Sequence, residues 1–196
     1  KTDNTSSLSL VEIDSTNIVI NTLKFEGTRK QGEEHVSFER EFESGMTCPM
    51  SQNSYVSTIN FDIPQGSYSE FDIELGIQDS SYYYPYYSYN SSLSVYGTYV
   101  NIVLDTIRVI FIFNNAQSIH LSASTDIVLQ EDMPASADLV LNPDYWFSTV
   151  TQNMLENANV FMWWGEPTMF VSEWSNQNIY DLIINRITNG NNIVFH

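Results

Sequence analysis

Alternation of apolar and polar residues along short segments constrains the fold of this chain most strongly. It is cleanest in "YSEFDIELGI" (68–77), where the apolar residues Phe71, Ile73 and Leu75 alternate with Tyr68 and three acidic residues. Successive side chains of a β-strand point to opposite faces, so this pattern predicts a half-buried strand with Tyr68 on its polar side.

Similar segments recur about every ten residues, the spacing typical of β-sandwiches. We expect a break at Asp14–Ser15, a second at Gly27, and a loop at 45–54. The segment 106–114 is apolar on both faces, which predicts a central, covered strand. The expected strands are 7–13, 17–27, 35–44, 55–63, 68–77, 92–100, 106–114, 118–124, 126–130, 137–142 and a short one in "NIVFH" at the chain end.

Two helices are expected in the C-terminal third of the chain. Asn142-Pro143-Asp144 has the residue types of a helix start, which predicts a helix over 143–157. Ser175 as a cap and the apolar spacing after it predict a second helix over 176–189. Trp146, just after the first cap, is expected in the core.

The fold predicted from these segments is all-β. We expect a predominantly antiparallel β-sandwich, Ig-like or transthyretin-like, with two short helices. Residues 8–196 are expected to form one domain, behind a flexible N-terminal tether over 1–7. A hydrophobic content of 42% is enough for a real core, and the single cysteine excludes an intrachain disulfide.

The net charge of the chain limits the classes of partner that it can bind. Lys and Arg number 7 against 24 acidic residues, for a net charge of −17. Nucleic-acid binding needs basic patches that release counterions from phosphates, so we exclude it. The same charge repels anionic membrane surfaces, although acidity also simply keeps a protein soluble. No run approaches the roughly 20 apolar residues of a membrane helix.

Several segments resemble exported β-sandwich lipoproteins of the Bacteroidetes. They are "FDIPQGSYSEFDIELGI", "SLSVYGTYV", "LVLNPDYWF" and "NQNIYDLIINRITNGNNIVF". The resemblance implies a sandwich fold, export to the periplasm or the outer-membrane surface, and a lipid anchor on a cysteine preceding Lys1. The membrane would then be reached only through that anchor. A more distant similarity to the copper-associated MbnP-like domains rests on the turn at Gly66.

Catalytic patterns are weak in this chain. It contains no Gly-x-Ser-x-Gly elbow, and its histidines are His35, His120 and His196. Paired carboxylates of a glycoside hydrolase remain an alternative, but in so acidic a chain the candidates are too abundant to be informative. They are Asp72, Glu74, Glu131, Asp132 and Glu173. We therefore expect no enzyme and no cofactor.

Two candidate metal-binding sites remain as alternatives to this expectation. Met46, Cys48 and Met50 in "MTCPM" offer three soft sulfur ligands of the kind that suit Cu(I), on a loop stiffened by Pro49. The competing interpretation is that these sulfurs pack on the sandwich edge. Glu131, Asp132 and Asp138 are candidate calcium ligands, without an EF-hand pattern.

The aromatic residues carry the main functional expectation. "SSYYYPYYSYN" (80–90) contains six tyrosines, and Pro85 argues against a central strand. We expect 80–91 to form an exposed tip with at least two accessible rings. Tyrosine pairs a flat apolar face with a hydroxyl, which suits contact with sugars or proteins. The alternative is a hairpin tip whose rings pack on one another. The candidate binding residues here are Tyr83, Tyr84, Tyr86 and Tyr87.

Trp163 and Trp164 complete the candidate binding residues. Because they are adjacent, at most one points cleanly inward from an extended segment, and the more exposed one is free to join an aromatic platform. The expected function is a non-catalytic surface or periplasmic domain that binds a glycan or a protein partner. The rival interpretation is a structural or adhesive subunit of a surface assembly.

Overall fold

The computed structural model describes residues 9–30, 34–51, 56–60, 65–77, 91–114, 118–122, 127–129, 136–189 and 192–195. The strands are β1 (Glu12–Arg29), β2 (Glu34–Ser51), β3 (Val56–Asn60), β4 (Gly66–Ile77), β5 (Leu93–Val100), β6 (Thr106–Phe113), β7 (Ser118–Ser122), β8 (Ile127–Leu129), β9 (Ser136–Val140), β10 (Phe161–Trp163), β11 (Glu166–Val171) and β12 (Asn192–Phe195). The helices are α1 (Pro143–Phe147), α2 (Gln152–Glu156) and α3 (Gln177–Asn189).

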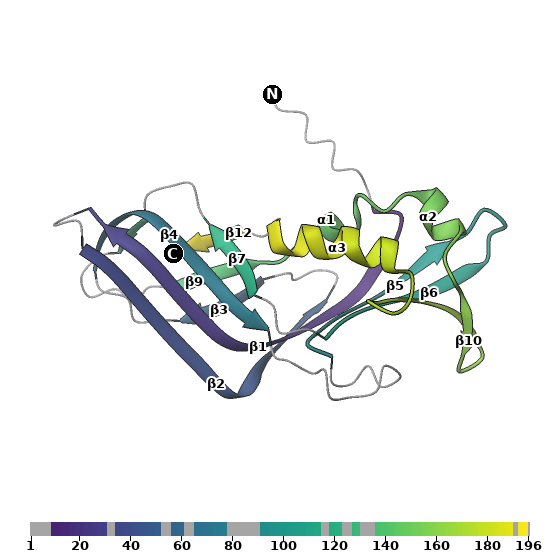
Figure 1. Ribbon diagram of the computed structural model, residues 1–196, viewed down its shortest axis with the longest axis horizontal. Coiled ribbons are helices and arrows are strands. Elements are labelled where there is room, and N and C mark those ends of the chain that lie inside the picture. Colours follow the sequence, from purple (N-terminus) through teal and green to yellow (C-terminus); the bar gives the residue numbers. More distant parts are fainter. Residues whose placement is uncertain are drawn as a thin grey trace, which may run out of the picture.

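Most strands belong to one large sheet of nine strands (Figure 1). Its main path runs β10-β11-β6-β5-β1-β4-β7, while β2 pairs with β1 and β8 pairs with β4. A second sheet has the order β12-β9-β3. Strand pairs are antiparallel except β6 with β11, which are parallel. The expected all-β, mostly antiparallel fold is confirmed, with one extended sheet carrying most of it.

Strand β1 is the central strand of this sheet, and two breaks that were expected in it are absent. It runs without interruption from Glu12 to Arg29, pairing with β5 in its first part and with β4 in its second. The turn-forming residue Asp14 falls at a register shift with β5, so it makes a bulge there rather than ending the strand. Gly27 lies within β1, where an added Cβ would stand 2.9 to 3.0 Å from ring carbons of Phe25 and Tyr68.

Tyr68 was expected on the polar side of its strand, and that expectation is wrong. Its side chain is fully buried and meets Phe25 edge-on, with the ring centroids 5.7 Å apart. The register between β1 and β4 shifts between Thr28 and Arg29, opposite Glu70 and Tyr68. Simple alternation fails across such an irregularity, because the residues on its two sides no longer share one parity.

Residues 45–51 were expected in a loop but belong to β2. Met46 pairs with Ile20 and Pro49 with Asn17, so β2 follows β1 along almost its whole length. The register jumps between Ile20 and Thr22, and Gly45 near this point has a φ of +70°. A glycine suits that left-handed conformation, and the irregularity lets the strand continue past a sequence that is typical of a turn.

The first expected helix is split in two. Asn142 caps α1 as predicted, accepting a hydrogen bond from the backbone N of Tyr145 at 3.1 Å, and Pro143 occupies the first turn. Thr151 then caps α2 by accepting from Met154 N at 3.4 Å. The second expected helix is α3, which begins at Gln177.

Helix α3 closes the core over the sheet (Figure 1). Ile179, Ile183 and Ile187 are buried along one side of it, at the spacing of a helix face. Tyr180 stacks on Phe111 of β6 at a centroid distance of 5.7 Å. Trp146 is fully buried beside them, as expected. The predicted central strand 106–114 is confirmed in β6, which lies between β5 and β11 and is buried over most of its length.

Candidate ligand-binding site

A tight hairpin joins β10 to β11 at one end of the sheet. Trp163 pairs with Glu166, which leaves Trp164 and Gly165 as the two turn residues. Both have positive φ, +55° and +85°. Two-residue hairpin turns favour this left-handed backbone because its twist matches that of the flanking strands. The hairpin therefore sets the direction of the two adjacent tryptophans.

An aromatic pocket of about 390 Å³ lies beside this hairpin. Strand pairing brings its walls together: Phe161 of β10 faces Thr168 of β11, and Phe170 of β11 is level with Ile110 of β6. None of the nine lining residues is charged. They are Ile112, Asn114, Phe161, Met162, Trp163, Phe170, Ser172, Trp174 and Ser175.

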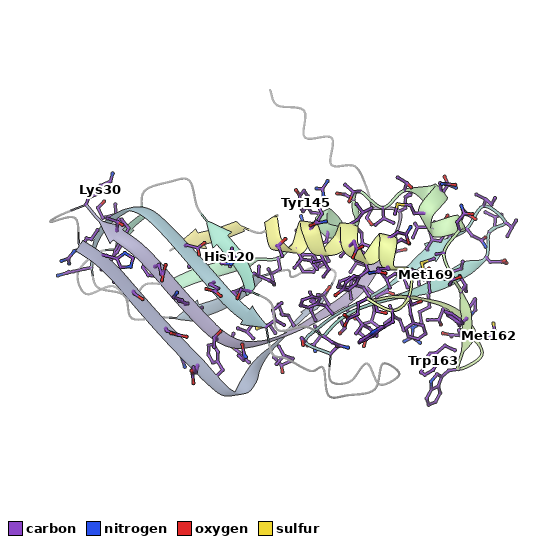
Figure 2. All side chains as sticks on the ribbon, in the orientation of Figure 1. Lys30, His120, Tyr145, Met162, Trp163 and Met169 are labelled. Carbon is purple, nitrogen blue, oxygen red and sulfur yellow. The ribbon has the colours of Figure 1, made fainter. Side chains whose placement is uncertain are left out.

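Trp163 is the centre of the aromatic contacts in this pocket. Its ring meets Phe170 edge-on, with centroids 5.5 Å apart and planes at 89°. The ring of Trp164 also contacts that of Trp163, with their centroids 6.5 Å apart. Trp163 is half-buried whereas Trp164 is largely exposed, so the two adjacent indoles play different parts. Figure 2 shows Met162 and Trp163 together at this end of the molecule.

The far wall of the pocket is a short turn before α3. Ser172 and Ser175 pair as an isolated bridge, with Ser172 N donating to Ser175 O at 2.8 Å. Trp174 stands between them, and its backbone N donates to Ser172 Oγ at 3.3 Å. This turn holds an exposed indole in a fixed place beside hydroxyl groups, an arrangement suited to binding a ligand with apolar and polar faces.

A second, more open hollow of about 550 Å³ lies near the β5–β6 connection. Glu156 of α2 is among its lining residues and accepts hydrogen bonds from Tyr99 Oη and, at 2.9 Å, from Ile102 N. Burial, followed by the hydrogen bond to Glu156, raises the pKa of Tyr99 to about 12. The carboxylate of Glu156 therefore links α2 to the β5–β6 connection, and we assign it a structural role.

The expected aromatic residues have mixed outcomes. Trp163 lines the pocket and Trp164 lies beside it. Tyr83, Tyr84, Tyr86 and Tyr87 lie outside the described residues, as does all of 78–90. Sequence reasoning missed Phe161, Met162, Phe170 and Trp174. Their shared signal is the density of large apolar residues over 160–174, without the clean alternation of a strand that is covered on one side.

The sulfur residues lie on a strand rather than on the expected loop. Cys48 is buried in the core opposite Ile18, and its Sγ lies 4.0 Å from the carbonyl oxygen of Met46. The side chain of Met46 packs against the same core, and that of Met50 lies outside the described residues. Within the described residues, no three His, Cys, Asp or Glu side chains gather where a metal ion would fit.

The carboxylate candidates are scattered in the structure. Asp72 pairs with His120 at 3.1 Å and Glu74 bonds to Ser118, both across β4 and β7. Glu173 is half-buried in the turn before α3. Glu131 and Asp132 lie outside the described residues, and Asp138 sits in β9 opposite Thr58 and Val194.

Comparisons of this chain with protein-family models, with curated proteins and with solved structures give no match. Among the helices in the described ranges, none has the length and apolar character needed to cross a membrane. The geometry of the pocket therefore supplies the grounds for a function.

Proposed function

We propose that this chain is a non-catalytic binding domain that takes a neutral glycan in the aromatic pocket. One observation carries the proposal: aromatic rings share an uncharged pocket with hydroxyl and amide side chains. A sugar presents C–H faces that stack on rings and hydroxyls that exchange hydrogen bonds with Ser and Asn. The pocket offers both kinds of contact.

The lining residues support binding over chemistry. Ser172 and Ser175 carry the only hydroxyls among the lining residues that the structure describes, and neither a carboxylate nor a histidine is among those residues. A serine nucleophile needs an adjacent base to be activated, and glycoside hydrolysis needs two carboxyl groups across the scissile bond. The described lining residues therefore supply groups that orient a ligand rather than groups that attack it.

Two observations on charge favour a neutral ligand. The described lining residues carry no charged side chain, and the whole chain has a net charge of −17. A polyanionic glycan would meet repulsion without a compensating cation in the lining, whereas a neutral glycan would meet none. A peptide is the competing ligand, because exposed tryptophans also anchor protein partners. The glycan is favoured because two hydroxyl side chains, Ser172 and Ser175, line the pocket together with Trp174.

The proposed setting is the cell surface or periplasm, with attachment through a lipid anchor. It rests on the segments that resemble exported lipoproteins of the Bacteroidetes. Reading the coding sequence upstream of Lys1 tests it, because a signal peptide followed by a lipobox cysteine is expected there. A signal peptide without that cysteine would remove the anchor and leave the proposed pocket unaffected.

Features of β2 speak against the rival role as a strand-exchanging assembly subunit. Among the described strands β2 pairs only with β1, so it forms a long edge. That edge contains an irregularity near Gly45 and a proline at position 49, which lacks a backbone N–H. Bulges and prolines are the features that block addition of another strand.

A glycan array probed with the full chain tests the proposed function. Trp174→Ala and Phe161→Ala each remove an exposed ring from the pocket, so the fold should survive. We expect each to weaken binding of a neutral glycan about two- to tenfold, since a stacking contact is worth about 0.5 to 1.5 kcal/mol beyond burial. Their melting temperatures should stay close to that of the wild type.

Tyr145→Ala is the matched control. Tyr145 is also an exposed aromatic residue, but it lies on α1, stacked under Arg186 at 4.4 Å and well away from Trp163 (Figure 2). Its loss should leave glycan binding unchanged. Equal binding by wild type and both pocket variants would contradict the proposal, and capture of peptides instead of glycans would replace it with a protein-binding role.

A further inference from the structure

Leu104 and Trp164 share an unusual combination of properties. Both are large apolar residues with positive φ, +70° and +55°. Both are almost completely exposed, at 82% and 88%. Within the described residues, Asn176 is the third non-glycine residue with positive φ, and it is buried and hydrogen-bonded. Asparagine is a residue type that tolerates this conformation, whereas leucine and tryptophan are not.

Neither backbone nor packing explains these two choices. A left-handed backbone is unfavourable for a residue with a Cβ, by about 1 to 2 kcal/mol. The side chains are so exposed that burial offsets little of that strain, even though the Trp164 ring contacts that of Trp163. Glycine or asparagine would serve both positions better if stability alone mattered. Large apolar side chains kept at such positions indicate contact with something outside the chain.

The β5–β6 connection presents its apolar residues on a rigid frame. Asn101 Oδ1 accepts hydrogen bonds from Val103 N at 3.1 Å and Asp105 N at 2.8 Å, and Leu104 N donates to Asn101 O at 3.0 Å. Glu156 holds Ile102 N from the other side. The tip therefore points Ile102, Val103 and Leu104 into solvent without depending on their side chains for its shape.

The two tips lie at the same end of the molecule. Figure 1 shows the β5–β6 connection and the β10–β11 hairpin together at one end of the long axis. Met162, which is also exposed, lies there, while Lys30 lies at the opposite end (Figure 2). Two strained, projecting apolar tips thus lie at one end of the molecule.

We propose that these two tips dock this end of the molecule onto a neutral, zwitterionic phospholipid bilayer. The tips are convex, and lipids yield to projections that a protein partner would have to match with two grooves. Aliphatic side chains such as Ile102 and Leu104 suit the acyl boundary, and an indole such as that of Trp164 suits the headgroup level.

The charges near the tips select the kind of lipid. Asp105 follows the first tip and Glu156 lies under it, while Glu166 follows the second tip and pairs with Arg108 at 3.8 Å. Because these three carboxylates outnumber the one cation that the structure describes beside them, this end repels phosphatidylglycerol and favours the choline end of a zwitterionic headgroup. Docking is thus driven by apolar contact and depends little on added salt.

Cosedimentation of the full chain with phosphatidylcholine vesicles tests the proposal. Wild type should bind them, and vesicles rich in phosphatidylglycerol should bind less. Leu104→Asn and Trp164→Asn should each weaken binding about tenfold, because each removes one of the inserted side chains. Both variants suit a left-handed backbone, so their melting temperatures should match or exceed that of wild type. Val128→Thr, at an exposed apolar position of β8, should bind as wild type does.

Several results would overturn the docking proposal. Wild type that fails to bind phosphatidylcholine, or Asn variants that bind as tightly as wild type, would do so directly. A wild-type dimer that Leu104→Asn dissociates would assign the tips to a second copy of the chain instead. Leu104→Asn tests docking separately from the pocket, because Leu104 does not line the pocket, whereas Trp164 contacts the Trp163 ring that does. Loss of vesicle binding with glycan binding intact would support the docking proposal alone.

Discussion

The side-chain amide of Asn176 bonds both backbone groups of Asn159. Asn159 N donates to Asn176 Oδ1 at 2.7 Å, and Asn176 Nδ2 donates to Asn159 O at 3.1 Å. The same Nδ2 also donates to Phe170 O at 2.8 Å. One buried side chain thus joins the segment leading into β10, strand β11 and the start of α3, which are the elements that carry the aromatic pocket.

Removing this side chain should loosen the pocket. Asn176→Gly keeps the positive φ but leaves the backbone groups of Asn159 and Phe170 without these partners, so we expect a loss of about 2 kcal/mol in the free energy of unfolding. Asn176→Ala should lose about 1 kcal/mol more, because alanine is strained in that conformation. Urea unfolding measures both. Asn178→Ala, at an exposed position on α3, is the control and should be nearly neutral. Wild-type stability in Asn176→Gly would show that these bonds contribute nothing.

Two glycines should respond to alanine for different reasons. Gly165 has a φ of +85° and open space around its missing Cβ, so Gly165→Ala should cost about 1 to 2 kcal/mol of backbone strain alone. Gly97 lies inside the sheet, where an added Cβ would stand 2.4 Å from the carbonyl oxygen of Glu12. Gly97→Ala should therefore cost more, since β1 and β5 must move apart. Gly165→Asn should recover most of the first loss, and a milder effect at Gly97 than at Gly165 would contradict this account.

Two buried tyrosines should make the fold sensitive to alkaline pH. Burial raises the pKa of Tyr99 and of Tyr180 to about 12 from an ordinary value of 10.0, with Glu156 adding to the first and Glu173 and Asp181 to the second. A raised pKa means that the folded state holds the proton more tightly than the unfolded state. The resulting stability is complete below the unfolded pKa near 10 and is lost as pH rises toward about 12.

Chemical denaturation measured across alkaline pH checks this expectation, with tyrosinate absorbance followed in parallel. Tyr180→Phe keeps the ring stacked on Phe111 and removes the titrating hydroxyl. Its stability should fall less steeply than that of wild type above the ordinary tyrosine pKa. Identical slopes for the two proteins would mean that Tyr180 ionises as readily in the folded chain as in the unfolded one.

Cys48 should behave as a core residue. Its side chain is buried among apolar residues, including Ile18 opposite it in β1. We therefore expect slow labelling by a thiol reagent in the native protein and fast labelling in denaturant. Cu(I) titration should give no tight binding that Cys48→Ser abolishes. Rapid native labelling together with tight, Cys48-dependent Cu(I) binding would restore the soft-metal hypothesis.

Local signals in the sequence predicted local structure well. Asn142-Pro143-Asp144 specified the start of α1, because a cap depends on residues only three positions apart. The breaks expected at Asp14 and Gly27 failed because long-range pairing absorbed them. Gly27 leaves room for the rings of Phe25 and Tyr68, a close approach that only the tertiary structure creates. The sequence alone does not distinguish a glycine that forms a turn from one that makes room for a neighbouring side chain.

The pocket was predictable only in part, for the same reason. Adjacent tryptophans at 163 and 164 indicated that one of them would be exposed. Phe170 and Ile112 join them through the parallel pairing of β11 with β6, two strands about 60 residues apart in the chain. No local pattern encodes that pairing, so Trp174 and Ser172 were not recognised as neighbours of Trp163.

The tyrosine-rich stretch provides the last prediction, which tests whether it shares a ligand with the pocket. Replacing Tyr83, Tyr86 and Tyr87 together by serine should weaken glycan binding and leave the melting temperature nearly unchanged, if these rings contact ligand rather than core. Combining that triple variant with Trp174→Ala forms a double-mutant cycle. If one glycan spans both regions, the combined loss should differ from the sum of the two losses by about 0.5 kcal/mol or more. Strict additivity would indicate separate contacts. A large fall in melting temperature would instead show that the tyrosines belong to the core, and the recognition role of the stretch would fall with that result.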